Sequence, residues 1–387
     1  MPRAEYRFFR WRCRSGSLRI LHVVTNSDLG GAPRVVTELS SRAVRDGHEC
    51  AVAASPNGPM WDRLDARVKH EPIAAMRRKI DPFHDSLVLL SLLKLYRSYA
   101  PDIVHLHSSK AGALGRVAAM LSGKSLSRRC LYTVHGFDTI LASHREFLPL
   151  ERLLSAYCGA IVPVSSYDER QMIKARLNGK ITLIKNGVTD RRGVPGANPS
   201  IEQRIIDAKA AGRPVVLSIA RLEAPKRPDL FIAVARMIPE ASFFWVGNVS
   251  APGQEYFGGA IQPANVAFLG ECPEAGNLIN FCDVFLLLSD YEGLPMSILE
   301  ALSCGKAVVA SKVGGIPEAL GGSGGEAAGF AVPNAPEAVA AQVRRLLRDA
   351  GLRRSLGMGA RSMYEAEFSA ERMWASYLNL YSSMVLS

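Results

Sequence analysis

Two carboxylates in the second half of the chain, Glu292 and Glu300, have a setting that suits the binding of hydroxyl groups. A carboxylate accepts hydrogen bonds from sugar or ribose hydroxyls through both of its oxygens. Glu300 is flanked by Leu299 and Ala301, and a buried carboxylate without a partner is costly, so we expect it to be paired. A polyol ligand is therefore predicted. The alternative is a solvated helix glutamate beside a loop glutamate.

Two cations, Arg221 and Lys226, follow the first predicted strand of the second half, residues 214–219. Lys226 is expected to start a helix, where its charge opposes the helix dipole, so an anionic ligand explains it better than helix stability does. Arginine offers a fork to phosphate oxygens and lysine a point charge. Such charge-assisted hydrogen bonds contribute roughly 1.5–3 kcal/mol each, and they matter most when a leaving diphosphate gains charge. Two surface cations after a loop are the alternative.

A glycine pair, Gly30 and Gly31, stands directly before another predicted helix, with Pro33 close behind. Free N–H groups at a helix start form an anion site, although a plain tight turn has the same sequence. The spacing is not G-x-G-x-x-G, so dinucleotide binding is not supported. His135 follows the predicted strand at residues 131–134, which places it at the ligand edge of a sheet, unless it only caps that strand.

One stretch of the second half shows how the chain positions these groups. Residues 284–288 are an apolar run short enough for a buried strand. Pro295 stands where a helix can begin, Gly305 can end that helix, and residues 306–310 form a second apolar run. The two strands should be parallel, and ligands bind outside the carboxyl ends of such strands. The loop that carries Glu292 lies at such an end.

Short apolar runs alternate with helical patterns along the chain, which predicts an α/β protein with doubly wound parallel sheets. The further runs are residues 18–24, 49–53, 103–107, 160–164, 181–184, 242–246 and 266–269. Glycine, proline and polar residues dominate residues 189–199, where we place the link between two domains. A ligand is expected in the cleft between the two sheet edges.

Composition and cysteine usage fit a protein of a reducing compartment. The chain has 387 residues, of which 48% are hydrophobic and 21% charged, and this suggests two globular domains. Its seven cysteines are far apart, odd in number and without C-x-x-C spacing, which argues for free thiols. No apolar run reaches the roughly 18 residues of a membrane span, and the N-terminus lacks the apolar core of a secretory signal. A cytoplasmic location is therefore expected.

Positive charge gathers in the first half. Residues 1–190 carry 29 Lys and Arg against 17 Asp and Glu, a net +12, whereas residues 191–387 carry 18 against 19, a net −1. This asymmetry predicts contact with an anionic surface, and a membrane is favoured over nucleic acid because no nucleic-acid motif occurs. The candidates are residues 77–79 and a basic leader at residues 1–17, with about 1 kcal/mol for each well-placed cation. An arginine-rich composition, or a disordered leader, is the alternative.

Two histidines, His105 and His107, end the predicted strand at residues 103–107. A metal site needs three or four ligands at suitable spacing, and no third ligand stands near this pair in the sequence. We therefore expect no metal there.

Taken in order, these motifs resemble the retaining glycosyltransferases of the GT-B fold called family 4, or glycosyl transferases group 1. The resemblance covers residues 18–385, and Glu292-x7-Glu300 is its most specific element. The other elements are Gly30-Gly31-Ala32, His135-Gly136, Lys185-Asn186-Gly187-Val188, Arg221-x4-Lys226 and Gly314-Gly315-Ile316-Pro317-Glu318. The resemblance implies Rossmann-like acceptor and nucleotide-sugar domains at residues 18–190 and 191–365, and a last segment, residues 366–387, that crosses back to the first domain.

The resemblance also implies transfer of a sugar from a nucleotide-diphosphate donor with the anomeric configuration kept. Arg221 and Lys226 would hold the diphosphate, Glu300 would accept from the ribose, and His135 would sit beside the reacting sugar. The other donor-binding residues would be Gly30, Gly31, Glu292, Gly293, Leu294, Pro295 and Met296.

The preferred chemical hypothesis is a front-face reaction through an oxocarbenium-like centre, because no protein nucleophile is evident in the sequence. The acceptor hydroxyl would lose its proton to the leaving phosphate. No cofactor is expected, and the lack of any Asp-x-Asp in the chain fits chemistry without a metal. The basic first domain indicates a lipid-linked or envelope-polysaccharide acceptor at the inner face of a membrane.

Departures from the family pattern leave the donor sugar and its base open. Ala220 and Arg227 stand where glycine is common around Arg221 and Lys226, and Pro33 replaces a frequent acidic residue. Two alternatives remain: a sugar-nucleotide epimerase on the same fold, and a nucleotide-binding regulator without turnover. The product distinguishes them, since it is a new glycoside, an epimerised nucleotide or neither.

Overall fold

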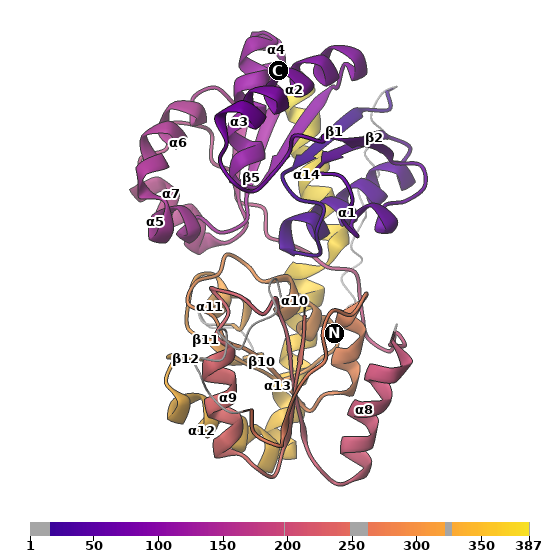
Figure 1. Cartoon of the computed structure of the whole chain (residues 1–387), viewed down its shortest axis with the longest axis vertical. Helices are drawn as coiled ribbons and strands as arrows, with labels where there is room; N and C mark the ends of the chain where they lie inside the picture. Colours follow the sequence, from indigo (N-terminus) through magenta and orange to yellow (C-terminus); the bar gives the residue numbers. More distant parts are fainter. Residues whose placement is uncertain (1–15, 197, 248–261, 322–326, 387) are drawn as a thin grey trace, which may run out of the picture.

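The computed structural model describes residues 16–196, 198–247, 262–321 and 327–386. Nearly all of the predicted basic leader therefore lies outside the described residues. Within them, the chain forms two α/β domains, one above the other in Figure 1.

The first domain is built on a six-stranded parallel sheet with the order β3-β2-β1-β4-β5-β6. Its strands are β1 (Arg19–Val24), β2 (Glu49–Ala54), β3 (Lys69–Pro72), β4 (Ile103–His107), β5 (Cys130–Val134) and β6 (Ala160–Pro163). Its helices are α1 (Gly31–Arg45), α2 (Pro82–Tyr99), α3 (Ser109–Leu121), α4 (Lys124–Arg128), α5 (Asp138–Ser143), α6 (Leu148–Ser155) and α7 (Ser166–Lys174).

The second domain repeats this design with the strand order β12-β11-β10-β7-β8-β9, again all parallel. Its strands are β7 (Val215–Ile219), β8 (Ser242–Val246), β9 (Val266–Phe268), β10 (Val284–Leu287), β11 (Val308–Ser311) and β12 (Gly329–Val332). Its helices are α8 (Pro199–Ala210), α9 (Pro228–Met237), α10 (Met296–Ser303), α11 (Ile316–Ala319), α12 (Pro336–Arg348) and α13 (Ala350–Met363). Two doubly wound parallel sheets confirm the predicted fold class.

The strands are apolar because helices cover both faces of a parallel sheet. Successive residues of a strand point to opposite faces. Ile20 and Leu21 accordingly belong to different core clusters. The cluster that contains Ile20 also contains Leu299 of the second domain, so part of the core is continuous between the domains.

The last helix, α14 (Ala370–Leu386), returns from the second domain to the first. It is the yellow helix that rises beside the upper sheet in Figure 1. Tyr377 and Tyr381 are fully buried, and the Trp374 indole donates to Asp46 across a distance of 2.5 Å. The predicted crossing of the C-terminal segment is therefore confirmed.

Three local predictions were wrong. Residues 181–184 form no strand, since only Ile181 makes a single bridge, to Ile161. The edge strands β3 and β12 were missed because β3 is polar and exposed and β12 is only partly buried. Lys226 precedes α9 without starting it, because Pro228 occupies the first helical position.

Candidate active site

The carboxyl ends of strands from both sheets meet at the junction of the two domains. The loop after β10 carries Glu292 and Gly293, and the segment after β5 carries His135 and Gly136. A Cβ atom placed on Gly293 would lie 3.0 Å from the Cα atom of Gly136. The two backbones therefore approach so closely that a side chain on Gly293 would push them apart by a few tenths of an ångström.

A second glycine pair holds the loop after β10 in place. The Gly315 N–H donates to the Gly293 carbonyl at 2.9 Å. Gly314 has a φ of +53°, and a Cβ atom there would lie 1.6 Å from the Glu292 carbonyl oxygen, so no other residue fits. The motif at residues 314–318 thus fixes the backbone of Glu292 and Gly293.

The carboxylate of Glu292 forms an ion pair with the ammonium of Lys226. The loop before α9 is tied to the end of β10, since the Arg227 N–H donates to Leu288 at 3.1 Å and the Asp290 N–H donates to Pro225 at 2.9 Å. Both paired side chains are mostly buried, with 14% of Lys226 and 12% of Glu292 exposed. The structure thus brings together one predicted cation and one predicted carboxylate.

Arg221, the second predicted cation, pairs with Glu223 on the same loop. Glu223 also lies 3.7 Å from the guanidinium of Arg78, which belongs to the first domain. Arg78, a candidate for membrane contact, is 64% exposed and lies at the domain junction. Arg221 keeps 38% of its side chain exposed.

Glu300 is buried inside α10, with only 1% of its side chain exposed. Its Oε1 atom forms an ion pair with Arg34 and lies 4.0 Å from Nε of Arg191. Burial raises the pKa of Glu300, and the two guanidiniums counteract part of that rise. Within the described residues Oε1 accepts no well-directed hydrogen bond, although the Arg34 guanidinium pairs with it.

Three residues around Glu300 were missed by the sequence analysis. One of them, Glu274, forms ion pairs with three arginines. The N···O distances are 2.5 Å to Arg191, 3.4 Å to Arg63 and 4.0 Å to Arg34. Burial alone would raise the pKa of Glu274, but the three arginines hold it below its ordinary value. Arg34 had a signal in the sequence, because a cation near a helix start opposes the dipole. Arg191 and Glu274 reach the site only through the tertiary fold.

The N-terminus of α1, which begins at a glycine, faces the N-terminus of α10. Gly30 is the N-cap of α1, which begins at Gly31 and has no acidic residue in its first turn. A Cβ atom on Gly31 would lie 4.0 Å from the Met296 side chain. The free N–H groups of this helix start therefore lie next to the second domain, where an anion could be shared between the two.

His135 is half-buried just after the end of β5, and the loss of water around its ring lowers its pKa to about 4. Its Nε2 atom lies 3.1 Å from Nδ1 of His107, and its Nδ1 atom has no hydrogen-bond partner in the described part of the chain. The following loop is held by Asp168, which accepts from the Phe137 N–H at 2.8 Å. His135 is therefore a neutral, positioned imidazole.

His107 also belongs to a second histidine cluster. The imidazoles of His22, His105 and His107 offer nitrogen atoms within 4.8 Å of one another. His22 comes from β1, which neighbours β4 in the sheet, so sequence spacing could not reveal this third histidine. The pair therefore has a third histidine beside it in space, and the expectation of no metal there stays a prediction.

Other family-like motifs form contacts between the domains. Glu318 accepts from the Ser166 N–H at 2.8 Å and pairs with Lys185 at 2.8 Å. Asn186 donates to the Leu294 carbonyl at 3.0 Å. These contacts hold the loop after β10 against the first domain.

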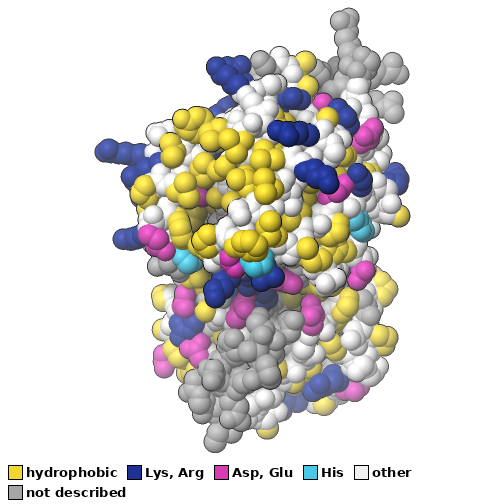
Figure 2. Space-filling view, turned by 45° about the horizontal axis from the view of Figure 1, so that its top comes forward, with side chains coloured by type: hydrophobic (Ala, Val, Ile, Leu, Met, Phe, Trp, Pro, Cys, Tyr) yellow, Lys and Arg dark blue, Asp and Glu magenta, His cyan; other side chains and the backbone are white. Residues whose placement is uncertain are grey.

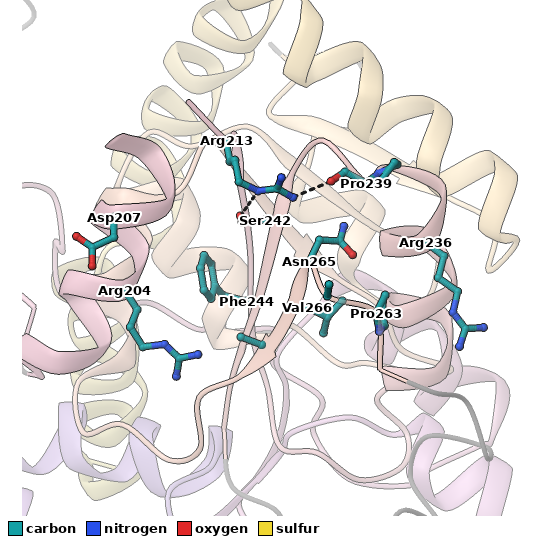
Figure 3. Close-up of a pocket in the computed structure, with 12 residues that line it drawn as sticks. Arg204, Asp207, Arg213, Arg236, Pro239, Ser242, Phe244, Pro263, Asn265 and Val266 are labelled. Carbon is teal, nitrogen blue, oxygen red and sulfur yellow. Dashed lines mark hydrogen bonds between the residues drawn. The ribbon is translucent and has the colours of Figure 1, made fainter. Parts of the chain in front are cut away.

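A cavity of about 660 Å³ lies elsewhere in the second domain (Figure 3). It is lined by residues at the amino ends of β8 and β9, among them Ser242 and Val266. Arg213 at its wall donates to Ser242 and to the Pro239 carbonyl. Because ligands of such sheets bind at the opposite, carboxyl edge, we do not assign the active site to this cavity.

Comparison with known proteins agrees with this geometry. Two family models match the chain, Glycosyltransferase Family 4 over residues 29–192 and Glycosyl transferases group 1 over residues 200–363. The chain is 29% identical, over 77% of its length and 80% of the relative, to an Escherichia coli protein named UDP-Gal:alpha-D-GlcNAc-diphosphoundecaprenol alpha-1,3-galactosyltransferase.

Solved structures show the same fold. A sucrose-phosphate synthase from Thermosynechococcus elongatus matches with a TM-score of 0.79 and 21% identity, over 95% of this chain and 99% of that one. HepE of Anabaena, in complex with UDP-glucose, matches with a TM-score of 0.78 and 20% identity, over 95% of this chain and 100% of the HepE chain. With family models that together span most of its length, the chain is a glycosyltransferase of the GT-B fold and belongs to family 4, glycosyl transferases group 1.

Proposed function

We propose that the protein transfers a sugar from a nucleotide-diphosphate donor to a lipid-linked or envelope-polysaccharide acceptor, with retention of configuration and without a metal ion. One observation carries the proposal. The loop after β10 carries Glu292, which pairs with Lys226, and leads into α10, which contains Glu300. The same loop lies against Gly136 of the first domain. This sheet edge can hold an anion and several hydroxyls together.

In this proposal, Arg221 and Lys226 bind the diphosphate. The ammonium of Lys226 is paired with the carboxylate of Glu292. A bound diphosphate would replace Glu292 as the partner of this ammonium, and the Glu292 carboxylate could then accept hydrogen bonds from hydroxyls of the donor sugar. Glu300 would accept from the ribose through Oε1, the oxygen that lacks a well-directed hydrogen bond within the described residues. The start of α1 at Gly31 would face the phosphates from the other domain.

The proposed reaction breaks the bond between the anomeric carbon and the diphosphate oxygen. The acceptor oxygen attacks the same face of the sugar, and its proton passes to the departing phosphate oxygen. Arg221 and Lys226 stabilise the charge that develops on the leaving group. Burial keeps His135 neutral near pH 7, so its ring does not repel an oxocarbenium-like centre.

The acceptor proposal rests on the first domain and on the relatives. The matched Escherichia coli protein is named for a diphosphoundecaprenol acceptor, and a capsular-polysaccharide glycosyltransferase of Staphylococcus aureus matches over 95% of this chain. No helix among the described residues is long and apolar enough to cross a bilayer. A lipid-linked acceptor would then be reached from the inner membrane surface.

We further propose that one face of α2 docks on an anionic bilayer. Phe83, Leu87 and Leu90 recur at helical spacing and are 68%, 39% and 61% exposed, and the same stripe continues as the exposed cations Lys94 and Arg97. An apolar face that continues into basic residues suits an interfacial helix.

Neighbouring helices also carry exposed apolar side chains. Helices α2 and α3 pack together, as do α3 and α6. Leu121 at the end of α3 is 59% exposed and Leu153 of α6 is 57% exposed. Figure 2 shows the apolar side chains gathered on the upper domain, with Lys and Arg around them.

The donor site can be tested by thermal stabilisation with UDP-, GDP- and ADP-sugars in EDTA. A ligand at a hundred times its Kd stabilises the folded protein by about 2.7 kcal/mol. We expect one nucleotide series to stabilise the wild type, and Arg221→Ala to lose most of that effect. Stabilisation that appears only when a divalent metal is added would overturn metal independence, and stabilisation by no donor would overturn the site.

A further inference from the structure

The segment that carries His135 is tied to helix α7 by a buried carboxylate, that of Asp168. Its Oδ1 atom accepts from the Phe137 N–H at 2.8 Å, and its Oδ2 atom accepts from the Ser165 hydroxyl at 2.9 Å. Asp168 is fully buried, so both oxygens serve neighbours within the fold.

Within the described residues, no cation pairs with this carboxylate, since its two hydrogen-bond donors are a neutral amide and a neutral hydroxyl. Burial raises the pKa of Asp168 to about 6, and the nearby carboxylates of Asp138 and Glu318 raise it further. A buried carboxylate without a cation costs folding free energy, and such perturbed groups are frequent at functional sites. We therefore looked for a role of Asp168 in the candidate active site.

The same first turn of α7 reaches the second domain. The Glu318 carboxylate accepts from both the N–H and the hydroxyl of Ser166, at 2.8 and 2.9 Å. Gly315 packs against the preceding residue of this turn, because a Cβ atom on Gly315 would lie 2.8 Å from the Cβ atom of Ser165. Helix α7 is therefore fastened to residues 314–318, which fix the backbone of the loop after β10.

These contacts close a ring around the domain junction. From α7, Asp168 leads to the segment after β5, whose Gly136 lies against Gly293 of the loop after β10. From that loop, the hydrogen bond between Gly315 and Gly293 leads back to Glu318 and to α7. The ring includes both of the segments that supply proposed site residues, one from each domain.

The bond from Phe137 to Asp168 sets the orientation of the Gly136–Phe137 peptide, because a peptide unit is planar. Gly136 has a φ of +132°, and a glycine allows the backbone more conformational freedom than other residues do. A fixed peptide directly after this glycine limits that freedom, and His135 stands directly before it.

We propose that Asp168 is a positioning residue that closes this ring and so holds His135 in place opposite the loop that bears Glu292. The ring follows from the contacts alone, and its role towards a bound sugar rests on the proposed function. A second tie, from the Tyr167 hydroxyl to Asp138 at 3.1 Å, limits how far the segment can move. Loss of the Asp168 carboxylate should therefore displace His135 without opening the domain junction.

Hydrogen exchange of backbone amides, followed by NMR at pH 7 without any donor, tests the tie directly. The Phe137 amide should exchange slowly in the wild type and in Asp168→Asn, whose side-chain carbonyl still accepts. In Asp168→Ala it should exchange at least roughly tenfold faster. The Ser166 amide should stay protected in all three proteins, because α7 remains docked on Glu318.

Fast exchange of the Phe137 amide in the wild type would overturn the proposal, whether or not the variants fold. Equal protection of Phe137 in the wild type and in Asp168→Ala would also overturn it. This readout needs neither donor nor turnover, so failure of the proposed function leaves it unaffected.

Steady-state kinetics then tests the effect of the tie on the proposed transfer. A displacement of about 1 Å can cost on the order of a hundredfold in rate, and the tie that remains allows less. We expect kcat to fall roughly tenfold in Asp168→Ala and to stay near the wild-type value in Asp168→Asn. The KM for the donor should not change, because the proposed donor contacts of Lys226 and Glu300 lie on other elements.

Ser165→Ala is the matched control. It removes the hydroxyl that the same carboxylate accepts and that caps α7, but it leaves the bond from Phe137 to Asp168 in place. We expect this variant to lower the urea midpoint and to keep kcat and Phe137 protection. Equal losses of kcat in Ser165→Ala and Asp168→Ala would contradict a positioning role, since Asp168 would then only support α7.

Discussion

Gly293 and Gly136 bring the two domains into backbone contact, because a Cβ atom on Gly293 would lie 3.0 Å from both the N and Cα atoms of Gly136. This contact sets the loop that bears Glu292 against the segment that bears His135. Groups from both domains can therefore act on one bound molecule, and the spacing between them depends on two residues without side chains.

Gly293→Ala should separate these two segments. The added methyl group meets backbone atoms that cannot rotate away, so the two segments must part by a few tenths of an ångström. Because a displacement of about 1 Å can cost on the order of a hundredfold in rate, we expect this smaller one to lower kcat by roughly tenfold while the urea midpoint changes little. Gly351→Ala in α13 is the matched control, since its nearest neighbour is one side-chain oxygen of Asp349 at 3.3 Å and no backbone atom lies close. Equal losses in both variants would contradict this account.

Lys226→Ala should lower kcat/KM by about tenfold to a hundredfold, because one charge-assisted contact with the diphosphate is lost. The variant also leaves Glu292 without its ion-pair partner. The double variant Lys226→Ala/Glu292→Gln removes that unpaired charge. In steady-state kinetics, kcat/KM of the double variant should stay as low as that of Lys226→Ala. A return of kcat/KM towards the wild-type value would mean that Lys226 acts only by neutralising Glu292.

Glu300→Gln should abolish discrimination between ribose and deoxyribose nucleotides. A hydroxyl bound to a carboxylate contributes roughly 1.5–3 kcal/mol, so wild type should bind a ribonucleoside diphosphate at least tenfold more tightly than its deoxy analogues. Calorimetric titrations of both proteins with both ligands measure this difference. Undiminished discrimination in Glu300→Gln would place the ribose elsewhere.

Charged substitutions on the exposed face of α2 should release the protein from anionic vesicles. Leu90→Glu puts a carboxylate on a side chain that is 61% exposed, where it would face lipid headgroups. Met358→Glu in α13 is the matched control, because Met358 is 63% exposed but lies in the second domain. Sedimentation with phosphatidylglycerol vesicles should fall only for Leu90→Glu, and equal binding of both variants would rule out docking by α2.

Folding stability should fall as the pH drops below about 6.5. The pKa values of His22 and His135 are lowered from 6.5 to about 3 and about 4, so the unfolded chain takes up their protons first. Each proton changes the free energy of unfolding by about 1.4 kcal/mol per pH unit. The stabilisation is complete above pH 6.5 and is lost progressively towards pH 4.

Some carboxyls work in the opposite direction. Burial raises the pKa of Asp168 to about 6 and also raises the pKa values of Glu300 and Asp138, so the folded protein gains stability from these groups as they take up protons. The five histidines with lowered pKa values outnumber them, and urea midpoints should therefore decrease between pH 7 and pH 5. His22→Asn should decrease less steeply, and a flat profile in the wild type would show that the histidines are not buried as described.

The fold could be predicted largely from apolar runs, because strands such as β10 are buried on both faces and contain little else. Edge strands lack such an apolar run. The residues of β3, Lys69 to Pro72, are polar because they are mostly exposed to water, so their sequence resembles that of a loop. Glu300 was expected to have a partner, but Arg34 and Arg191 are separated from it by over a hundred positions in the sequence. Only the tertiary fold brings such distant charges together.

The anomeric configuration of the product is the most direct test of the proposed transfer. The protein would be incubated in EDTA with an α-linked nucleotide sugar and a diphospholipid-linked saccharide acceptor, and the new glycoside would be examined by proton NMR. The account predicts an α-glycoside whose formation is lost in Lys226→Ala. A β-glycoside, an epimerised nucleotide without transfer, or a strict need for added metal would contradict it.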